Sequence, residues 1–230
     1  MRVLRIIGKG AVAFYDELFF YMVVGLINLV CWIFIIPGPF AIAGIYAISQ
    51  QAVRSKGVNW ALIWDGVKEY GLRSLALFLI LIAVYAVVGA NVWFYLDPNV
   101  SPFPPGVALW TTPVFLLAGL IWTGVTFYAQ ALLMELQEPK MGLVLRNGLF
   151  LTLLQPFQTL GLLIVSLLSL ILSIALPLLL IVWPGFISCL AVTAARELIT
   201  DLRERAETMG IGQEGDEQEQ EVEADDGDTQ

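Results

Sequence analysis

The feature that most constrains this chain is an apolar stretch at residues 18–53, which contains no Asp, Glu, Lys or Arg and is interrupted by Pro37-Gly38-Pro39. As one straight helix it would extend about 54 Å, whereas the hydrocarbon core of a bilayer is about 30 Å thick. The stretch must therefore fold back at the break, or cross once and lay its remainder along the membrane surface. Either arrangement predicts a multi-span membrane protein.

The composition agrees with this class. Hydrophobic residues make up 58% of the chain and charged residues 14%, with a mean hydropathy of +0.79. Soluble domains average about 45–50% apolar and about 25% charged residues. The net charge of −8 comes from the carboxyl end, because nine of the 20 acidic residues lie at 213–230, where there is no basic residue. The rest of the chain is nearly neutral, and nothing in it predicts binding to nucleic acid.

The predicted fold class is all-α, a polytopic bundle of about six membrane-crossing helices. Residues 149–195 carry no charged side chain and would extend about 70 Å as one helix, so they are expected to cross twice. The reversal falls at Pro177 or at Pro184-Gly185; we favour the latter because it echoes Pro37-Gly38. The second crossing is short, about 21 Å, and could instead be a re-entrant or interfacial piece. The six predicted crossings are 18–36, 40–53, 74–96, 107–134, 153–176 and 185–199.

Amphipathic segments between these crossings predict helices in the membrane interface. Residues 1–17 mix basic and apolar side chains, and a weaker pattern follows at 141–148. The clearest case is 60–73, where apolar residues recur at helical spacing opposite four charged ones. Residues 196–206 should continue as a helix into water, ending a transmembrane domain at 1–206. The remainder, 207–230, is expected to be a disordered acidic tail on the cytoplasmic side.

The basic residues predict the orientation. All 12 fall in four segments, namely the amino end, 54–73, 140–146 and 196–205, and the loop at 97–106 has none. The positive-inside rule therefore places those four segments, and with them both termini, in the cytoplasm. An even number of crossings must then separate the amino end from 54–73. A five-span arrangement would put 54–73 outside, against the rule.

Residues that could carry chemistry are scarce. The chain has no His and two Cys, so a zinc or transition-metal site is not expected, and Cys31 and Cys189 are predicted to be small buried side chains. No predicted span carries a charged residue in its interior, which argues against proton relays and ion-coupled pumps. Nucleotide-binding, hydrolase and metalloprotease motifs are lacking. We therefore predict no enzyme, no cofactor, and no catalytic, cofactor-binding or metal-binding residue.

Uncharged polar residues inside the predicted spans remain as candidate functional positions. In the fourth span Gly119, Thr123, Thr126 and Gln130 fall on one helical face. Helix packing through small and hydrogen-bonding side chains explains such a stripe; a path for an uncharged solute is the alternative. Two asparagines are the most costly groups to place in lipid, and each is expected to hydrogen-bond to a neighbouring helix. The candidate positions are Asn28, Asn91, Thr123, Thr126 and Gln130.

Several short motifs resemble those of the YesL-like family of bacterial membrane proteins. They are Asn28-Leu29 with Trp32, Pro37-Gly38-Pro39, the Lys68-Glu69-Tyr70 helix, and Arg146-Asn147-Gly148-Leu149 followed by Pro156 and Thr159-Leu160. The likeness covers roughly residues 15–198, and Phe40 departs from the small residue expected after Gly-Pro. It implies a protein of the bacterial cytoplasmic membrane, often associated with carbohydrate uptake. It supplies no functional residues.

These observations lead to a non-enzymatic multi-pass membrane protein that is accessory to a transport system or to another membrane complex; the resemblance implies carbohydrate uptake as the transport process. Its expected partners are the lipid bilayer and an unknown membrane protein. The alternative is a small facilitator for an uncharged solute, which would use the polar stripe and the two asparagines. A third hypothesis makes the acidic tail an electrostatic lure for basic partners.

Overall fold

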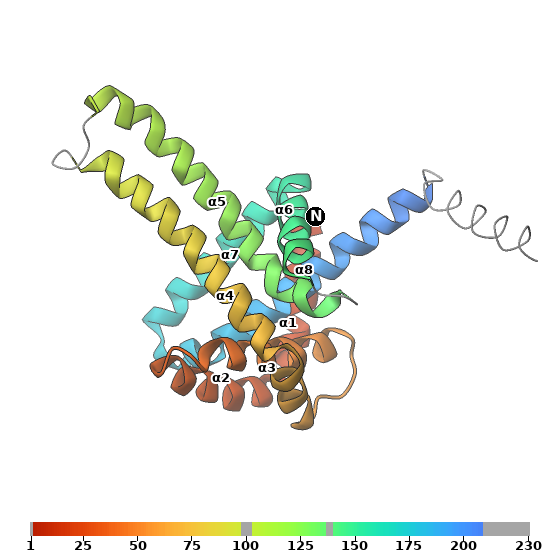
Figure 1. Ribbon diagram of the computed structural model, residues 1–230. Coiled ribbons are helices and arrows are strands. Elements are labelled where there is room, and N and C mark those ends of the chain that lie inside the picture. The colour runs from red at the N-terminus through yellow and green to blue at the C-terminus, as the bar shows by residue number, and fades with distance from the viewer. Residues whose placement is uncertain (1, 98–102, 137–139, 209–230) are drawn as a thin grey trace, which may run out of the picture. The chain divides into compact units, whose positions relative to one another are not determined.

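The structure is a computed structural model that describes residues 2–97, 103–136 and 140–208. Those residues form eight helices and no strand (Figure 1). The predicted all-α fold is therefore confirmed, as a helical bundle. The helices are α1 (Arg2–Asp16), α2 (Leu18–Ile33), α3 (Gly38–Val53), α4 (Ala61–Leu96), α5 (Pro105–Glu135), α6 (Met141–Leu154), α7 (Pro156–Ala175) and α8 (Pro177–Thr208).

The chain divides into two compact units, Met1–Ala195 and Arg196–Gln230, and α8 runs from the first into the second. In the second unit α8 continues to Thr208, so the helix predicted at 196–206 is confirmed. Most of the predicted acidic tail, residues 209–230, lies outside the described residues. The domain boundary predicted between 206 and 207 stays a prediction.

Fewer helices are suited to crossing a membrane than the sequence predicted. Among the described residues four are long and apolar enough, Ala61–Leu96, Gly106–Glu135, Pro156–Ala175 and Pro177–Glu204. A fifth is obtained only if α1 and α2, which meet at 85°, are taken as one broken span. The helices α2 and α3 have 16 residues each, about 24 Å against a hydrocarbon core of about 30 Å. The structure thus supports the bundle but not six crossings.

Two predicted boundaries are wrong. The amphipathic segment 60–73 is not a separate helix, because α4 continues without interruption for 36 residues, about 54 Å. The amphipathic part and the apolar part that follows it contain no proline, so no residue interrupts the helix between them. The last reversal lies at Leu176, before Pro177, and not at Pro184, which is inside α8. Proline suits the first turn of a helix, where its missing N–H would have no partner anyway.

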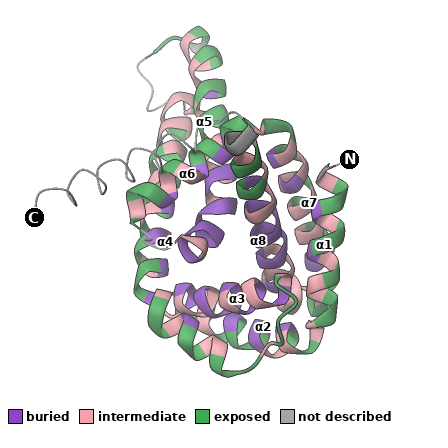
Figure 2. Ribbon diagram, turned by 90° about the vertical axis from the view of Figure 1, so that its right-hand side faces the viewer, coloured by how far each residue is buried: buried purple, intermediate pink, exposed green. Residues whose placement is uncertain are grey.

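The centre of the first unit is built from α3, α4 and α5. The helix α3 runs antiparallel to the first half of α4, and close contact depends on glycine: a Cβ at Gly66 would stand 2.5 Å from the Cβ of Ala47, and one at Gly71 would stand 2.5 Å from the Phe40 ring. The helix α5 then returns along α4. Figure 2 shows buried residues on the inward sides of the helices, including α3, and exposed residues along their outer sides.

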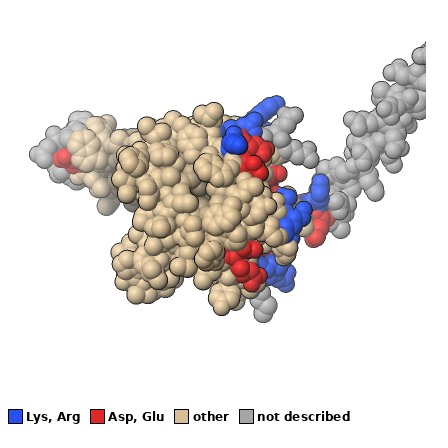
Figure 3. All heavy atoms as spheres, turned by 90° about the horizontal axis from the view of Figure 1, so that it is seen from below, with Lys and Arg blue, Asp and Glu red and all other residues tan. Residues whose placement is uncertain are grey.

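Charged side chains of the first unit gather toward one side, where Lys, Arg, Asp and Glu lie together, whereas most of the remaining visible surface is uncharged (Figure 3). One ion pair marks this side: Arg54 donates to Glu135 at 3.2 Å and joins the carboxyl ends of α3 and α5. The first turns of α4 follow α3 closely in sequence, so their charged residues lie near this pair. We call this the charged side. The far end of α4, at Leu96, points away from it.

Candidate functional site

The polar stripe predicted on the fourth span is the face that α5 turns toward α4. A Cβ at Gly119 would lie 3.3 Å from Val88. Further along, the Tyr85 hydroxyl donates to Thr123 Oγ1 at 3.1 Å and lies 3.3 Å from Thr126 Oγ1. Both threonine hydroxyls also donate to carbonyls of their own helix, at 2.8 and 2.9 Å. The stripe therefore meets a neighbouring helix directly.

Gln130 ends the stripe and links three helices. Its side-chain nitrogen donates to Ser74 Oγ on α4 at 2.8 Å, and Ser74 Oγ donates to the carbonyl oxygen of Pro39 on α3, also at 2.8 Å. Both polar side chains are buried, with 8% and 2% of their surface exposed. The relay ties the carboxyl-terminal half of α5 to the start of α3. These two short bonds between buried side chains hold the three helices against one another.

The two asparagines do not behave as predicted. Asn91 donates to the carbonyl oxygen of Val87 at 2.8 Å, which is a bond within its own helix. Asn28 is 4% exposed, and its Oδ1 has no hydrogen-bond partner among the described residues. The expected bond to a neighbouring helix is therefore wrong for Asn91 and is not made by the Asn28 carbonyl oxygen. The five candidate positions do not converge on one site.

A second buried polar cluster joins α2, α3 and α8, and sequence reasoning missed it. The Tyr21 hydroxyl lies 3.0 Å from Ser49 Oγ and 2.9 Å from Cys189 Sγ. Ser49 Oγ in turn lies 2.6 Å from Ser188 Oγ. Tyr21 and Cys189 are 168 positions apart, so no local pattern could have paired them. The only signal was the presence of hydroxyl groups in otherwise apolar segments.

Both cysteines are free thiols. Cys189 is fully buried, as predicted, whereas Cys31 is only half-buried. Further side-chain bonds join other helix pairs: Tyr128 and Thr159 connect α5 with α7 through oxygen atoms 3.1 Å apart, and the Trp183 indole donates to Ser169 Oγ between α8 and α7. Most of these hydroxyl groups are thus engaged within the bundle.

Nothing in the described part of the chain groups three or more His, Cys, Asp or Glu side chains as a metal site would require. A shallow groove lies on the amino-terminal half of α5. Large, mainly apolar side chains line it: Leu109, Trp110, Pro113, Val114 and Leu117. Trp110 is 79% exposed there. Such a surface offers contact to lipid or to another apolar helix, and the Trp110 indole N–H is its one polar side-chain group.

Comparison with known proteins adds no assignment. The chain matches no family model, and no curated protein or solved structure is significantly similar to it.

Proposed function

We propose that this chain is a non-enzymatic multi-pass membrane protein that acts as an accessory subunit of a transport system or another membrane complex. The observation that carries this proposal is that the polar stripe on α5 packs against α4. The side chains of Thr123, Thr126 and Gln130 form hydrogen bonds with side chains of α4 instead of lining a cavity. Side chains used in this way hold helices together.

The exposed apolar surface favours a partner within the membrane. Large apolar side chains are exposed near the carboxyl end of α4 and near the amino end of α5, where the groove lies. Among them are Trp93 and Trp110, which are 60% and 79% exposed. Aromatic side chains are enriched where proteins bind one another, and also near the membrane interface. A partner helix seated in the groove would bury this surface.

The orientation is part of the proposal. Charged residues of the first unit gather on one side (Figure 3), and the basic residues of the whole chain avoid the loop between α4 and α5. We place the charged side in the cytoplasm, with both termini there. The motifs that resemble those of YesL-like proteins lead us to propose the bacterial cytoplasmic membrane as the location and a carbohydrate-uptake system as the partner.

The test combines purification with transport. The tagged chain is extracted in mild detergent, and a defined membrane partner is expected to co-purify. Trp110→Ala should weaken that association, whereas Leu72→Ala, a substitution at a residue 75% exposed on the first half of α4, should leave it unchanged. Deletion of the gene should lower solute uptake. Normal uptake together with the lack of any co-purifying membrane protein would refute the proposal.

The facilitator remains the second candidate, because Asn28 presents a buried carbonyl oxygen that has no hydrogen-bond partner within the described part of the chain. Proteoliposomes containing the pure chain should then pass a neutral sugar faster than empty vesicles. Gln130→Leu and Asn91→Leu should reduce that flux if the polar residues form the path. A flux that neither substitution changes would count against this candidate.

A further inference from the structure

We propose that the α2–α3 hairpin is re-entrant: it enters the bilayer from the charged side, turns inside the hydrocarbon core and returns to the same side. The inference rests on the membrane placement given above and goes beyond it, because it assigns the hairpin tip to the interior of the bilayer. Four helices, α4, α5, α7 and α8, then make the crossings.

Depth along α4 is the first argument. The amino end of α3 lies beside the middle of α4, where Ser74 Oγ donates to Pro39, and the end of α2 packs there too, with the rings of Trp32 and Phe78 5.3 Å apart. Beyond Phe78, α4 continues to Leu96, about 27 Å further along its axis. At the average helix tilt of about 20° this distance is nearly all depth. The hairpin therefore ends well short of the far end of α4.

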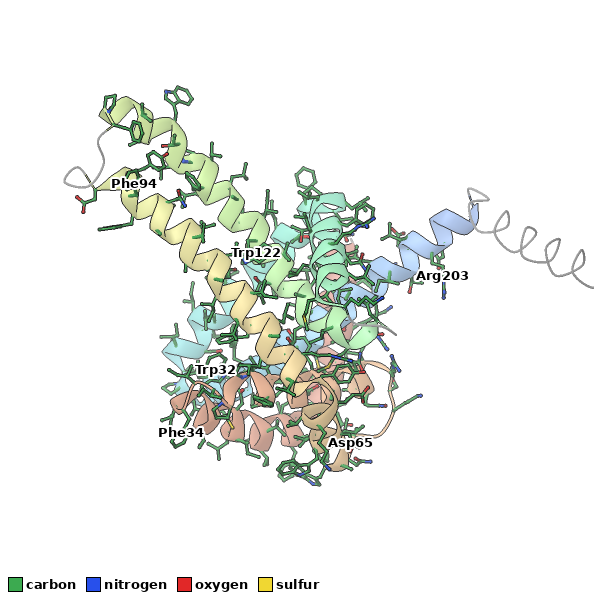
Figure 4. The ribbon with its side chains drawn as sticks, viewed as in Figure 1. Trp32, Phe34, Asp65, Phe94, Trp122 and Arg203 are labelled. Carbon is green, nitrogen blue, oxygen red and sulfur yellow. The ribbon has the colours of Figure 1, made fainter. Side chains whose placement is uncertain are left out.

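The side chains of the turn are the second argument. Four consecutive residues are apolar and between 63% and 73% exposed, and no polar side chain lies between them and α3; they are Ile33, Phe34, Ile35 and Ile36. Figure 4 shows Phe34 at this tip and Asp65 on the opposite side. A turn that emerged into headgroups or water would expose these four side chains to a polar medium. In hydrocarbon their exposure is favourable.

The backbone of the turn is the third argument. A non-helical segment is tolerated in hydrocarbon only if its polar groups are satisfied. Every N–H from Phe34 to Pro39 is accounted for, because two of the residues are prolines and the other four donate within the turn at 2.6–3.2 Å. The bonds run from Phe34 to Cys31, Ile35 to Trp32, Ile36 to Phe34 and Gly38 to Ile35.

A strained residue agrees with this assignment. Ile35 has φ 60°, in the left-handed region that a β-branched side chain rarely adopts. Glycine or asparagine fits that conformation with less strain, and either would suit a turn exposed to water. An isoleucine at this position is explained if the side chain has to face hydrocarbon.

The closing experiment measures depth in the full-length chain in lipid vesicles. Single cysteines replace Ile36 at the tip, Gly57 on the charged side and Gly106 at the start of α5; a Cβ at either glycine meets nothing within 4 Å. The parent chain, which retains Cys31 and Cys189, gives the labelling background. A membrane-impermeant maleimide should label G57C from one side and G106C from the other. I36C should react only after detergent is added.

A fluorophore attached at each position then reports its depth through quenching by nitroxide lipids. The probe at 36 should be quenched most by nitroxides on the acyl chains, and those at 57 and 106 by nitroxides at the headgroup. Quenching of the probe at 36 by headgroup nitroxide, or labelling of I36C from the same side as G106C, would overturn the re-entrant hairpin. Labelling of all three cysteines from both sides of sealed vesicles would instead refute the membrane placement itself.

A pair of substitutions gives an independent check. Ile35→Asn and Ile35→Gly both relieve the backbone strain, but only asparagine adds a polar side chain. If the tip lies in hydrocarbon, Ile35→Asn should lower the unfolding temperature in vesicles by several degrees relative to Ile35→Gly. An equal or higher unfolding temperature for Ile35→Asn would overturn the proposal.

Discussion

At the scale of single residues, glycines set how closely the helices approach. The crossing of α2 and α8 is the tightest, because a Cβ at Gly25 would overlap the carbonyl oxygen of Ile181, and a Cβ at Gly185 would overlap the Tyr21 ring. We predict that Gly25→Ala forces the two helices apart and lowers the free energy of unfolding by about 1–3 kcal/mol or more. Thermal unfolding in detergent, followed by size-exclusion chromatography, measures the change.

A matched control separates this clash from the general effect of adding a methyl group. A Cβ at Gly89, toward the carboxyl end of α4, meets nothing within 4 Å. Gly89→Ala should therefore leave stability unchanged or raise it by up to about 1 kcal/mol, because alanine is the better helix former. Equal losses for Gly25→Ala and Gly89→Ala would contradict the close crossing.

At the scale of elements, the relay from Gln130 through Ser74 to Pro39 joins α5, α4 and α3. Ser74→Ala removes both bonds and leaves the Gln130 amide nitrogen and the Pro39 carbonyl without that hydroxyl. Gln130→Leu removes one bond and adds apolar surface. We predict a loss of about 1–3 kcal/mol in unfolding free energy for Ser74→Ala and less than about 1 kcal/mol for Gln130→Leu.

The ion pair between Arg54 and Glu135 provides the comparison, because its Arg54 side chain is 40% exposed. Solvent and salt screen such a pair, so Arg54→Ala should cost at most about 1 kcal/mol, and less at high salt. Chemical unfolding of the three variants at low and high salt measures this order. A larger loss for Arg54→Ala than for Ser74→Ala would show that the charged side, and not the buried relay, holds these helices together.

The sequence predicted most helices because apolar runs and helical periodicity are local signals. The polar stripe on α5 was also recognisable, since Thr123, Thr126 and Gln130 share a face by spacing alone. What they contact was not, because Tyr85 and Ser74 are reached only through the pairing of α4 with α5. The choice between Pro177 and Pro184 failed for a related reason: either proline is compatible with a helix, and packing selects the break.

At the scale of the whole molecule, the charge distribution gives the last prediction. The nine acidic residues at 213–230, with no basic residue among them, would attract a basic partner through long-range forces that salt screens. Deleting 207–230 should then weaken partner binding at low salt and have little effect at high salt. The unfolding temperature should stay the same, because a segment so rich in acidic residues and without aromatic ones adds no apolar core.

The co-purification assay at two salt concentrations measures this effect, and a second variant separates charge from length. Replacing the nine acidic residues by their amides keeps the tail but removes its charge, so it should reproduce the deletion if attraction is electrostatic. Retained binding in the amide variant, together with loss in the deletion, would assign recognition to specific tail residues instead. If neither variant changes binding at either salt concentration, the partner is held by the membrane helices alone, and the groove around Trp110 becomes its expected contact.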